Sequence, residues 1–454
     1  MLRFGNSEHF EIGGWEELAS LSRYGFSLVG HRFSYVSGCP QLQSLEAEEA
    51  ELQPDKILRV ESLKIAYCDR LNRLPQVLHE LTFLTVMEID NCRSLVSFAE
   101  NNLPPNLKKL TINDCENLEY LVDEKEDNKS MSSTLCLLED LKIFNCPSLM
   151  SLSSKGHKNI CNQLQLLEID QCSKLSCLFS NSKFPITLKH LRIGGCPMLE
   201  YIAEEFEESA CLESILFFTS GIKSLPRGLD KLIHLQEIRL KWCSNLVSFE
   251  ESGLPSTSFR VFRVSDCGNF GALPKCMASI TSLRRLGVCN CSADISFPSE
   301  GFPVNLTSLT ISNAPKIYGS LVEWGLNRLT SLQELRIGGG GCSNVVSFPE
   351  EGTGMMLPPS LTHIILFEFE NLEFMFSEGF QDLASLQRLK IRDCPKLTSL
   401  PEKDVLLSLG NLTIYRCPLL QEECSSDKGR EWSKISHIPF VAINGQAVIP
   451  RKSD

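Results

Sequence analysis

"LKIRDCPKL", residues 389–397, is one copy of a pattern that recurs along this chain. Similar stretches are "LTINDCENL" at 110–118, "LKIFNCPSL" at 141–149, "LEIDQCSKL" at 167–175 and "LRIGGCPML" at 191–199. Their alignment gives L-x-x-L-x-I-x-x-C-x-x-L, and fifteen copies lie between Leu63 and Leu420 at spacings of 23 to 31 residues. The chain is therefore a repeat array.

A leucine pattern with a period in the twenties is the signature of leucine-rich repeats. The alternation L-x-I predicts a short strand with one buried face. No single repeat can bury its apolar face alone, so each repeat adds one layer to a shared core. We therefore expect an α/β repeat solenoid, a leucine-rich-repeat horseshoe with a parallel sheet on its concave face.

The segments that return the chain to the next strand are of two kinds, both predicted to lie on the convex face. The first kind has helical apolar spacing and predicts short helices at 228–238, 325–335 and 379–389. The second contains proline, which excludes helix interiors, and predicts extended or 3₁₀ structure at 103–110, 184–191, 302–309 and 357–364.

The pattern divides the chain into three regions. Residues 1–60 are expected to form degenerate N-terminal repeats or an irregular segment, residues 61–420 the array of about fifteen repeats, and residues 421–454 a C-terminal cap and tail. A repeat array exposes its core at each end and needs a cap. The apolar residues expected to cover the last repeat are Trp432, Ile435, Ile438, Phe440 and Ile443.

One position of the repeat is cysteine in twelve of the fifteen copies. The fifteen residues at this phased position are Cys68, Cys92, Cys115, Cys146, Cys172, Cys196, Ser220, Cys243, Cys267, Cys291, Ala314, Cys342, Phe369, Cys394 and Cys417. Zinc sites need C-x-x-C pairs that close on one ion. The close pair here, Cys289 and Cys291, should point to opposite faces of its strand. Thiol catalysis needs a neighbouring base, and the eight histidines keep no fixed phase with the cysteines.

The remaining interpretation of the phased cysteine is structural. A small buried side chain with a weak S–H donor can meet a backbone carbonyl where the chain turns off the strand. Disulfides are disfavoured because the start of the chain, "MLRFGNSEHF", resembles no secretory signal. Reduced thiols indicate a protein of the cytoplasm or the nucleus.

Composition excludes several classes of function. The 454 residues carry a net charge of −12, which argues against nucleic-acid binding. No apolar run is long enough to span a membrane. The sequence contains no G-x-S-x-G, no H-E-x-x-H and no phosphate-binding G-x-x-x-x-G-K-[ST] motif. We therefore expect neither catalysis nor a cofactor nor a metal site.

The repeats and the C-terminal segment together resemble a known family. The stretch 386–401 reads L-x-x-L-x-I-x-x-C-P-x-L-x-S-L-P, and "KGREWSKISHIPFVAINGQ" follows at 428–446. Both resemble the repeat region of plant coiled-coil-type nucleotide-binding leucine-rich-repeat disease resistance proteins. Matching positions in the second stretch are Trp432, Ile435, His437, Ile438 and Pro439. The coiled-coil and nucleotide-binding motifs of that family have no counterpart in this sequence.

The resemblance implies a function in protein recognition. In that family the repeats sense pathogen effectors and hold the receptor inactive, so the implied partners are an effector or the receptor's nucleotide-binding domain. A general interaction scaffold, such as a ubiquitin-ligase adaptor, is the alternative. It would have an F-box-like helical region upstream of the repeats, which residues 1–60 do not show convincingly.

Candidate partner residues are the x positions of x-L-x-I-x, which point away from the core. In the last ten repeats these positions hold nine basic residues and two acidic ones, a charge that would steer an acidic partner. Large apolar groups beside arginines are typical of interfaces. The candidates are Phe218, Arg239, Lys241, Arg263, Ile365, Phe367, Arg388, Lys390, Arg392 and Tyr415, centred on 363–415. A solvated strand face with scattered apolar residues is the other interpretation.

Overall fold

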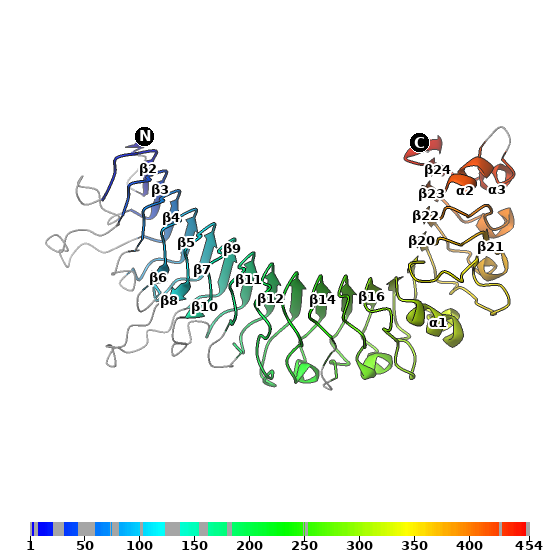
Figure 1. The fold of residues 1–454 in the computed structure, drawn as a ribbon, viewed down its shortest axis with the longest axis horizontal. Helices are drawn as coiled ribbons and strands as arrows, with labels where there is room; N and C mark the ends of the chain where they lie inside the picture. The colour runs from blue at the N-terminus through cyan, green and yellow to red at the C-terminus, as the bar shows by residue number, and fades with distance from the viewer. Residues whose placement is uncertain are drawn as a thin grey trace. The chain divides into compact units, whose positions relative to one another are not determined.

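The computed structural model describes residues 2–3, 8–20, 31–43, 60–72, 74, 81–99, 103–122, 137–153, 162–178, 184–247, 249, 253–425 and 429–450. They belong to two compact units, Met1–Leu235 and Gln236–Asp454. In each unit consecutive repeats lay their strands side by side in one parallel sheet (Figure 1). Each unit is therefore a leucine-rich-repeat solenoid, as the repeat pattern predicts.

The main sheet of the first unit begins upstream of the regular repeats. Its strands are β2 (His9–Gly13), β3 (Phe33–Ser37), β4 (Ser62–Ala66), β5 (Val86–Asp90), β7 (Lys109–Asn113), β9 (Asp140–Phe144), β11 (Leu166–Asp170), β12 (His190–Gly194) and β13 (Ser214–Phe218). β2 pairs with β3, and β3 pairs with β4, each time in parallel over all five residues. The two-residue strand β1 (Leu2–Arg3) pairs antiparallel with β2. Residues 1, 4–7, 21–30 and 44–59 of the 1–60 segment lie outside the described part.

The second unit repeats this arrangement. Its main strands are β14 (Glu237–Lys241), β15 (Val261–Ser265), β16 (Arg285–Cys289), β17 (Ser308–Ser312), β18 (Glu334–Gly338), β20 (His363–Phe367), β22 (Arg388–Arg392), β23 (Asn411–Tyr415) and β24 (Phe440–Ile443). The antiparallel strand β25 (Gln446–Ile449) follows β24. Equivalent residues of neighbouring repeats lie directly beside one another, because the register is unbroken from β14 to β23.

Alternation along each five-residue strand separates the core from the solvent. In β22 the second and fourth residues, Leu389 and Ile391, are fully buried. The first, third and fifth residues, Arg388, Lys390 and Arg392, are exposed or half-buried. We call the surface made by these odd-numbered strand positions the open face. It is the surface that the sequence pattern assigned to partners.

The return segments differ from the expected short helices. At 228–238, 325–335 and 379–389 the described helical structure is one 3₁₀ turn each, η4 (Leu229–Lys231), η6 (Leu326–Arg328) and η7 (Glu378–Phe380). The reason is the spacing of the buried leucines, for example Leu229, Leu232 and Leu235. A three-residue spacing fits the 3.0 residues per turn of a 3₁₀ helix. The extended structure expected for the proline segments is confirmed, since all four are turns and extended chain that lead into strands.

Two features of the return path were not predicted. One is a set of short strands in a second layer, which are β6 (Ser97–Ala99), β8 (Tyr120–Val122) and β10 (Ser151–Ser153) in the first unit and β19 (Ser347–Phe348) and β21 (Phe374–Met375) in the second. The other is helix α1 (Pro315–Trp324), which places proline in its first turn and ends at Gly325. Further 3₁₀ turns are η5 (Lys275–Ser279) and η8 (Lys403–Leu406).

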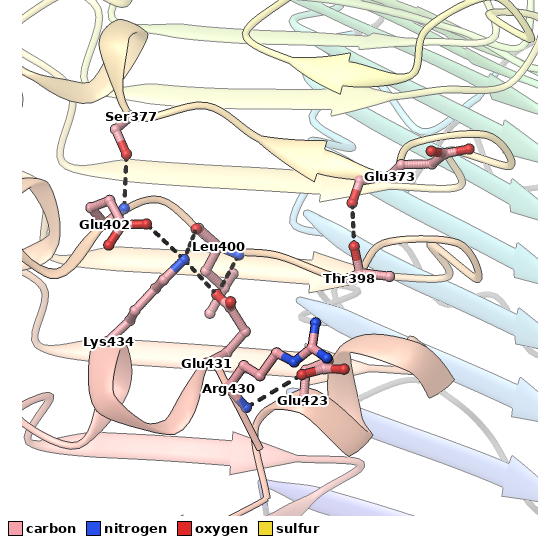
Figure 2. Close-up of polar contacts among 9 residues, drawn as sticks. All are labelled: Glu373, Ser377, Thr398, Leu400, Glu402, Glu423, Arg430, Glu431 and Lys434. Carbon is pink, nitrogen blue, oxygen red and sulfur yellow. Dashed lines mark hydrogen bonds and ion pairs between the residues drawn. The ribbon is translucent and has the colours of Figure 1, made fainter. Parts of the chain in front are cut away.

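The chain after the last regular repeat packs against it. Helices α2 (Pro418–Glu423) and α3 (Trp432–Ile435) precede β24, which pairs with β23. Figure 2 shows the polar contacts of α3. The carboxylate of Glu431, a residue only 5% exposed, accepts a hydrogen bond from the Leu400 amide at 2.8 Å. The Lys434 ammonium lies 3.1 Å from Glu431 and 3.0 Å from Glu402. Of the apolar residues expected to cover the last repeat, Ile435, Ile438 and Ile443 are buried, and Trp432 and Phe440 are half-buried.

Candidate partner-binding face

The phased cysteine holds the end of each strand. In eleven of the fifteen repeats, and also at Cys39 after β3, the cysteine Sγ donates to the carbonyl of the residue two positions earlier, which is the last residue of the strand, at 3.0 to 3.6 Å. The twelve are Cys39, Cys68, Cys92, Cys115, Cys146, Cys172, Cys196, Cys243, Cys267, Cys291, Cys394 and Cys417. The predicted role of the thiol as a buried donor in the turn is confirmed. Cys394 and Cys417 thereby fix the carbonyls of Arg392 and Tyr415, two candidate partner residues.

The cysteine contact depends on a backbone conformation that sequence reasoning missed. The residue before every phased position has a positive φ, from 48° at Asn313 to 78° at Gly341. Asparagine, aspartate and glycine reach this left-handed region most easily, and these residue types fill most of the positions. Their frequency just before the phased position was the signal that could have revealed the turn.

Burial makes the thiols of Cys196 and Cys291 poor nucleophiles. It raises the pKa of Cys196 and of Cys291 to about 12, because the charged thiolate is disfavoured away from water. Cys289, predicted to face outward, is half-buried on the open face. Among the described residues the cysteines form no disulfide. Within the same ranges, no three His, Cys, Asp or Glu side chains lie together as metal ligands.

In the first unit the open face pairs its own charges. Glu168 lies between two cations, 3.5 Å from Lys142 and 3.3 Å from Arg192. The Arg192 guanidinium is also 5.5 Å from the ring centre of Phe218, the candidate residue in this unit. Phe218 is therefore half-buried beside a cation that already has a counter-charge.

In the second unit the register brings together the candidates of 363–415. Phe367, Arg392 and Tyr415 are direct neighbours on three strands, and Ile365 lies beside Lys390. The Arg392 guanidinium stacks over the Phe367 ring with 5.4 Å to its centre. Tyr415 is 37% exposed. The aromatic and cationic side chains that the sequence singled out therefore form one group.

The charge of Arg392 is compensated from within the chain. Its guanidinium lies 3.0 Å from Asp393 and 3.5 Å from Glu368. Both carboxylates stand at the positive-φ turn positions, which sequence reasoning did not consider. Arg388 and Lys390 have no carboxylate within ion-pair distance among the described residues. Arg388 and Lys390 are therefore the available cations of this group.

A second set of cations lies over β14 to β18. The Arg239 guanidinium pairs with Glu237 and that of Arg336 with Glu334. In the described chain no acidic side chain pairs with Arg263 or with Arg285. Arg285 is one of the nine basic residues counted from the sequence, but it was not chosen as a candidate partner residue. The candidate Lys241 places its ammonium 3.7 Å from the ring centre of Trp242.

Comparison with known proteins agrees with the repeat architecture. The family of plant disease resistance protein RPS2-like leucine-rich repeats matches residues 51–197. The putative disease resistance protein At3g14460 of Arabidopsis thaliana is 32% identical over 420 residues, which are 92% of this chain and 26% of that protein. Disease resistance protein RPP4 of the same plant is 22% identical over 369 residues, covering 77% of this chain and 30% of the relative. The chain thus spans about a quarter to a third of the length of these relatives.

A solved structure of similar extent is the leucine-rich-repeat protein LIC12759 of Leptospira interrogans, 18% identical, with a TM-score of 0.49 over 88% of this chain and 94% of that one. In the part of the chain that the structure describes, no helix is long and apolar enough to cross a membrane. The sequence relatives and the solenoid agree on a leucine-rich-repeat region of the plant disease-resistance type.

Proposed function

We propose that this chain, whose repeats are those of plant nucleotide-binding leucine-rich-repeat resistance proteins, is the protein-recognition module of an intracellular plant immune receptor. In this role it has no catalytic activity of its own. Its open face senses a pathogen effector or binds the receptor's nucleotide-binding domain and keeps the receptor inactive. Relatives named as disease resistance proteins support this role. The reduced cysteines support a cytoplasmic or nuclear location.

One observation carries the proposal. The open face of the second unit holds cations that the described chain leaves without counter-charges, at Arg388 and Lys390, on the same strand as Arg392, which lies between the aromatic residues Phe367 and Tyr415. Surface charges of one sign are usually interspersed with opposite charges, as the Lys142, Glu168 and Arg192 contacts of the first unit illustrate. Exposed cations beside aromatic groups match the composition of interface hot spots. Their missing counter-charges would come from the partner.

The test is a two-hybrid screen of the full chain against secreted proteins of plant pathogens and against nucleotide-binding domains of plant resistance proteins. The test variant is Arg388→Glu/Lys390→Glu. The control variant, Lys174→Glu/Lys275→Glu, makes the same change of charge at two exposed residues outside the strands. We expect the test variant to lose the partners of the unmodified chain and the control variant to keep them. Partners that bind both variants equally would refute the assignment of the open face.

A further inference from the structure

The cations over β14 to β18 converge more closely than strand spacing alone requires. Arg263, Gly287, Thr310 and Arg336 occupy one row of the open face on four neighbouring strands. A Cβ added to Gly287 would lie 3.2 Å from Cγ of Arg263, and 3.7 Å from its Cβ and Cδ. The Arg263 stem therefore packs against Gly287 of β16, which the absence of a side chain at that glycine permits. Its guanidinium lies close enough to those of Arg239, Arg285 and Arg336 to be affected by their charges.

Arg285 approaches the same place from within β16. It is two residues before Gly287 on the same strand, so its Cα is ~7 Å from that of the glycine. We call Arg263, Arg285, Thr310 and Arg336 the arginine cluster. The Thr310 hydroxyl, half-exposed at its centre, has no hydrogen-bond partner among the described residues. Among the described residues, the cluster thus offers two guanidinium groups without a carboxylate partner and one free hydroxyl donor, in the part of the open face that also holds Gly287.

The electrostatics show that the members of the cluster influence one another. Although Arg263 as a residue is exposed, partial desolvation of its guanidinium lowers its pKa, and the charges of Arg239, Arg285 and Arg336 lower it further. Like charges held close together without a counter-ion raise the energy of the unliganded protein. An anion that binds there relieves this repulsion.

The charge balance sets the kind of anion. Glu237 and Glu334 already compensate Arg239 and Arg336, so the arginine cluster keeps the two positive charges of Arg263 and Arg285. Lys241 on β14 adds a third cation to this part of the open face. A carboxylate offers one negative charge and two oxygens. A phosphate monoester offers close to two negative charges and three acceptor oxygens, which is enough for both guanidinium groups and the Thr310 hydroxyl.

We propose that the arginine cluster binds the phosphoryl group of a phosphoserine or phosphothreonine in a protein partner. The inference rests on the proposed role in protein recognition and names the chemistry that one part of the open face recognises. Arg263 and Arg285 donate charge-assisted hydrogen bonds to the phosphoryl oxygens, and Thr310 donates from its hydroxyl. The carboxylates at both ends of the cluster, Glu237 and Glu334, repel a continuous polyanion. They favour a single phosphoryl group over a nucleic acid backbone.

The test measures binding of fluorescein-labelled synthetic peptides to the purified full chain by fluorescence anisotropy. The probes are Gly-Ser-Gly-pSer-Gly-Ser-Gly, the same peptide with serine at the centre, the same peptide with aspartate there, and a single-stranded RNA ten nucleotides long. We expect the phosphopeptide to bind at least ~10-fold more tightly than the aspartate peptide, because each 1.4 kcal/mol of additional interaction is a factor of ten. Inorganic phosphate should displace it.

Three variants locate the binding. Arg263→Gln/Arg285→Gln removes both free charges with little change in shape and should weaken phosphopeptide binding at least ~10-fold. Thr310→Val removes only the hydroxyl and should weaken it ~3-fold or more, in line with a net hydrogen bond of ~1 kcal/mol. Lys174→Glu/Lys275→Glu should leave it unchanged. Thermal unfolding of each variant confirms that its fold is retained.

Several results would overturn the inference. Equal affinities for the phosphopeptide and the serine peptide would do so, as would unchanged phosphopeptide affinity in Arg263→Gln/Arg285→Gln. So would tighter binding of the RNA than of the phosphopeptide, or binding of inorganic phosphate without binding of the phosphopeptide. Each would leave the proposed recognition function intact, provided that partners still depend on Arg388 and Lys390. Failure of the two-hybrid test with a positive phosphopeptide result would instead refute the location of the general partner surface.

Discussion

Replacing Glu431 by alanine should destabilise the C-terminal end of the second unit more than any exposed charge in the same region. The Glu431 side chain is 7% exposed and that of its partner Lys434 is 16% exposed. Glu431 is the acceptor for the Leu400 amide, and Lys434 donates in turn to the Leu400 carbonyl at 3.1 Å. Alanine would leave a buried amide without an acceptor and a buried ammonium with fewer partners.

The magnitude follows from these contacts. Leaving one buried backbone donor unsatisfied costs ~1–3 kcal/mol. Removing one member of a buried ion pair costs ~3–5 kcal/mol, but Lys434 keeps Glu402 at 3.0 Å and the Leu400 carbonyl. The lower end of this range therefore applies, and we expect a total near ~3 kcal/mol. For a unit of 150–250 residues this lowers the melting temperature by ~6–12 °C, at ~2–4 °C for each kcal/mol.

Thermal and urea unfolding followed by circular dichroism, with hydrogen exchange across 398–443, measure this effect. The matched control is Glu402→Ala, since Glu402 pairs with the same lysine but is 65% exposed. It should cost less than ~1 kcal/mol, as exposed ion pairs do. An unfolding free energy for Glu431→Ala within ~1 kcal/mol of that of the unmodified chain would refute the assigned role of the buried pair.

The same contacts predict a dependence on alkaline pH. Burial alone would lower the pKa of Lys434, but its hydrogen bonds to Glu402 and Glu431 outweigh burial and raise the pKa above the ordinary value of 10.5. When folding raises the pKa of a base, the resulting stabilisation is fully present at pH values below the pKa of the unfolded state. It is lost as the pH rises through the pKa of the folded state. Unfolding free energy should therefore fall above pH 10.5. The fall should be smaller in Glu431→Ala, and equal slopes for the two proteins would contradict the mechanism.

Three further predictions concern the turn after each strand. Cys394→Ala, which removes a buried thiol donor, should lower the unfolding free energy by ~1 kcal/mol, and an unchanged urea midpoint would argue against it. Burial raises the pKa of Cys196 to about 12, so Cys196 should react with a maleimide at neutral pH much more slowly than the half-buried Cys211. Mass spectrometry of the labelled peptides measures both rates, and equal rates would contradict the prediction. Gly195→Ala should cost ~1–2 kcal/mol, because φ is 54° there and the new Cβ would lie 2.8 Å from the Gln171 amide nitrogen; thermal unfolding at the temperature of the unmodified chain would contradict the cost.

The periodic part of the structure could be predicted from the sequence because it depends on burial. Leu389 and Ile391 alternate with charged residues, and that alternation suffices to define a strand and its two faces. The same phase places Cys394 inward at the turn. The second layer of strands could not be predicted in this way, since segments such as β6 have three residues and carry no readable period. Helix α1 has ten residues, but Ala314 before it was read only as a substituted cysteine.

Strand alternation predicted which side chains form the open face, but not which of their charges are compensated from within the chain. Strand alternation identifies Arg392 as outward, yet it does not show that Asp393 and Glu368 lie within ion-pair distance of it. Those two carboxylates come from left-handed turn positions, whose side-chain directions depend on backbone geometry and not on periodicity. In the same way, the path of Arg263 depends on a glycine in the neighbouring strand, 24 positions further along the chain. Such contacts depend on strand register and on side-chain rotamers, which the hydrophobic periodicity of the sequence does not determine.

The direction of β25 has a consequence for how arrays of this kind change length. Both edges of β24 are occupied, one by the parallel strand β23 and the other by the antiparallel strand β25. The strand of a further repeat would need to pair in parallel with β24, but the edge of β24 that faces away from β23 is already paired with β25. A gene duplication that adds repeats at this end of the array is therefore expected to insert them before β24. The open face can lengthen and diversify internally while the hairpin of β24 and β25 stays at the end of the sheet.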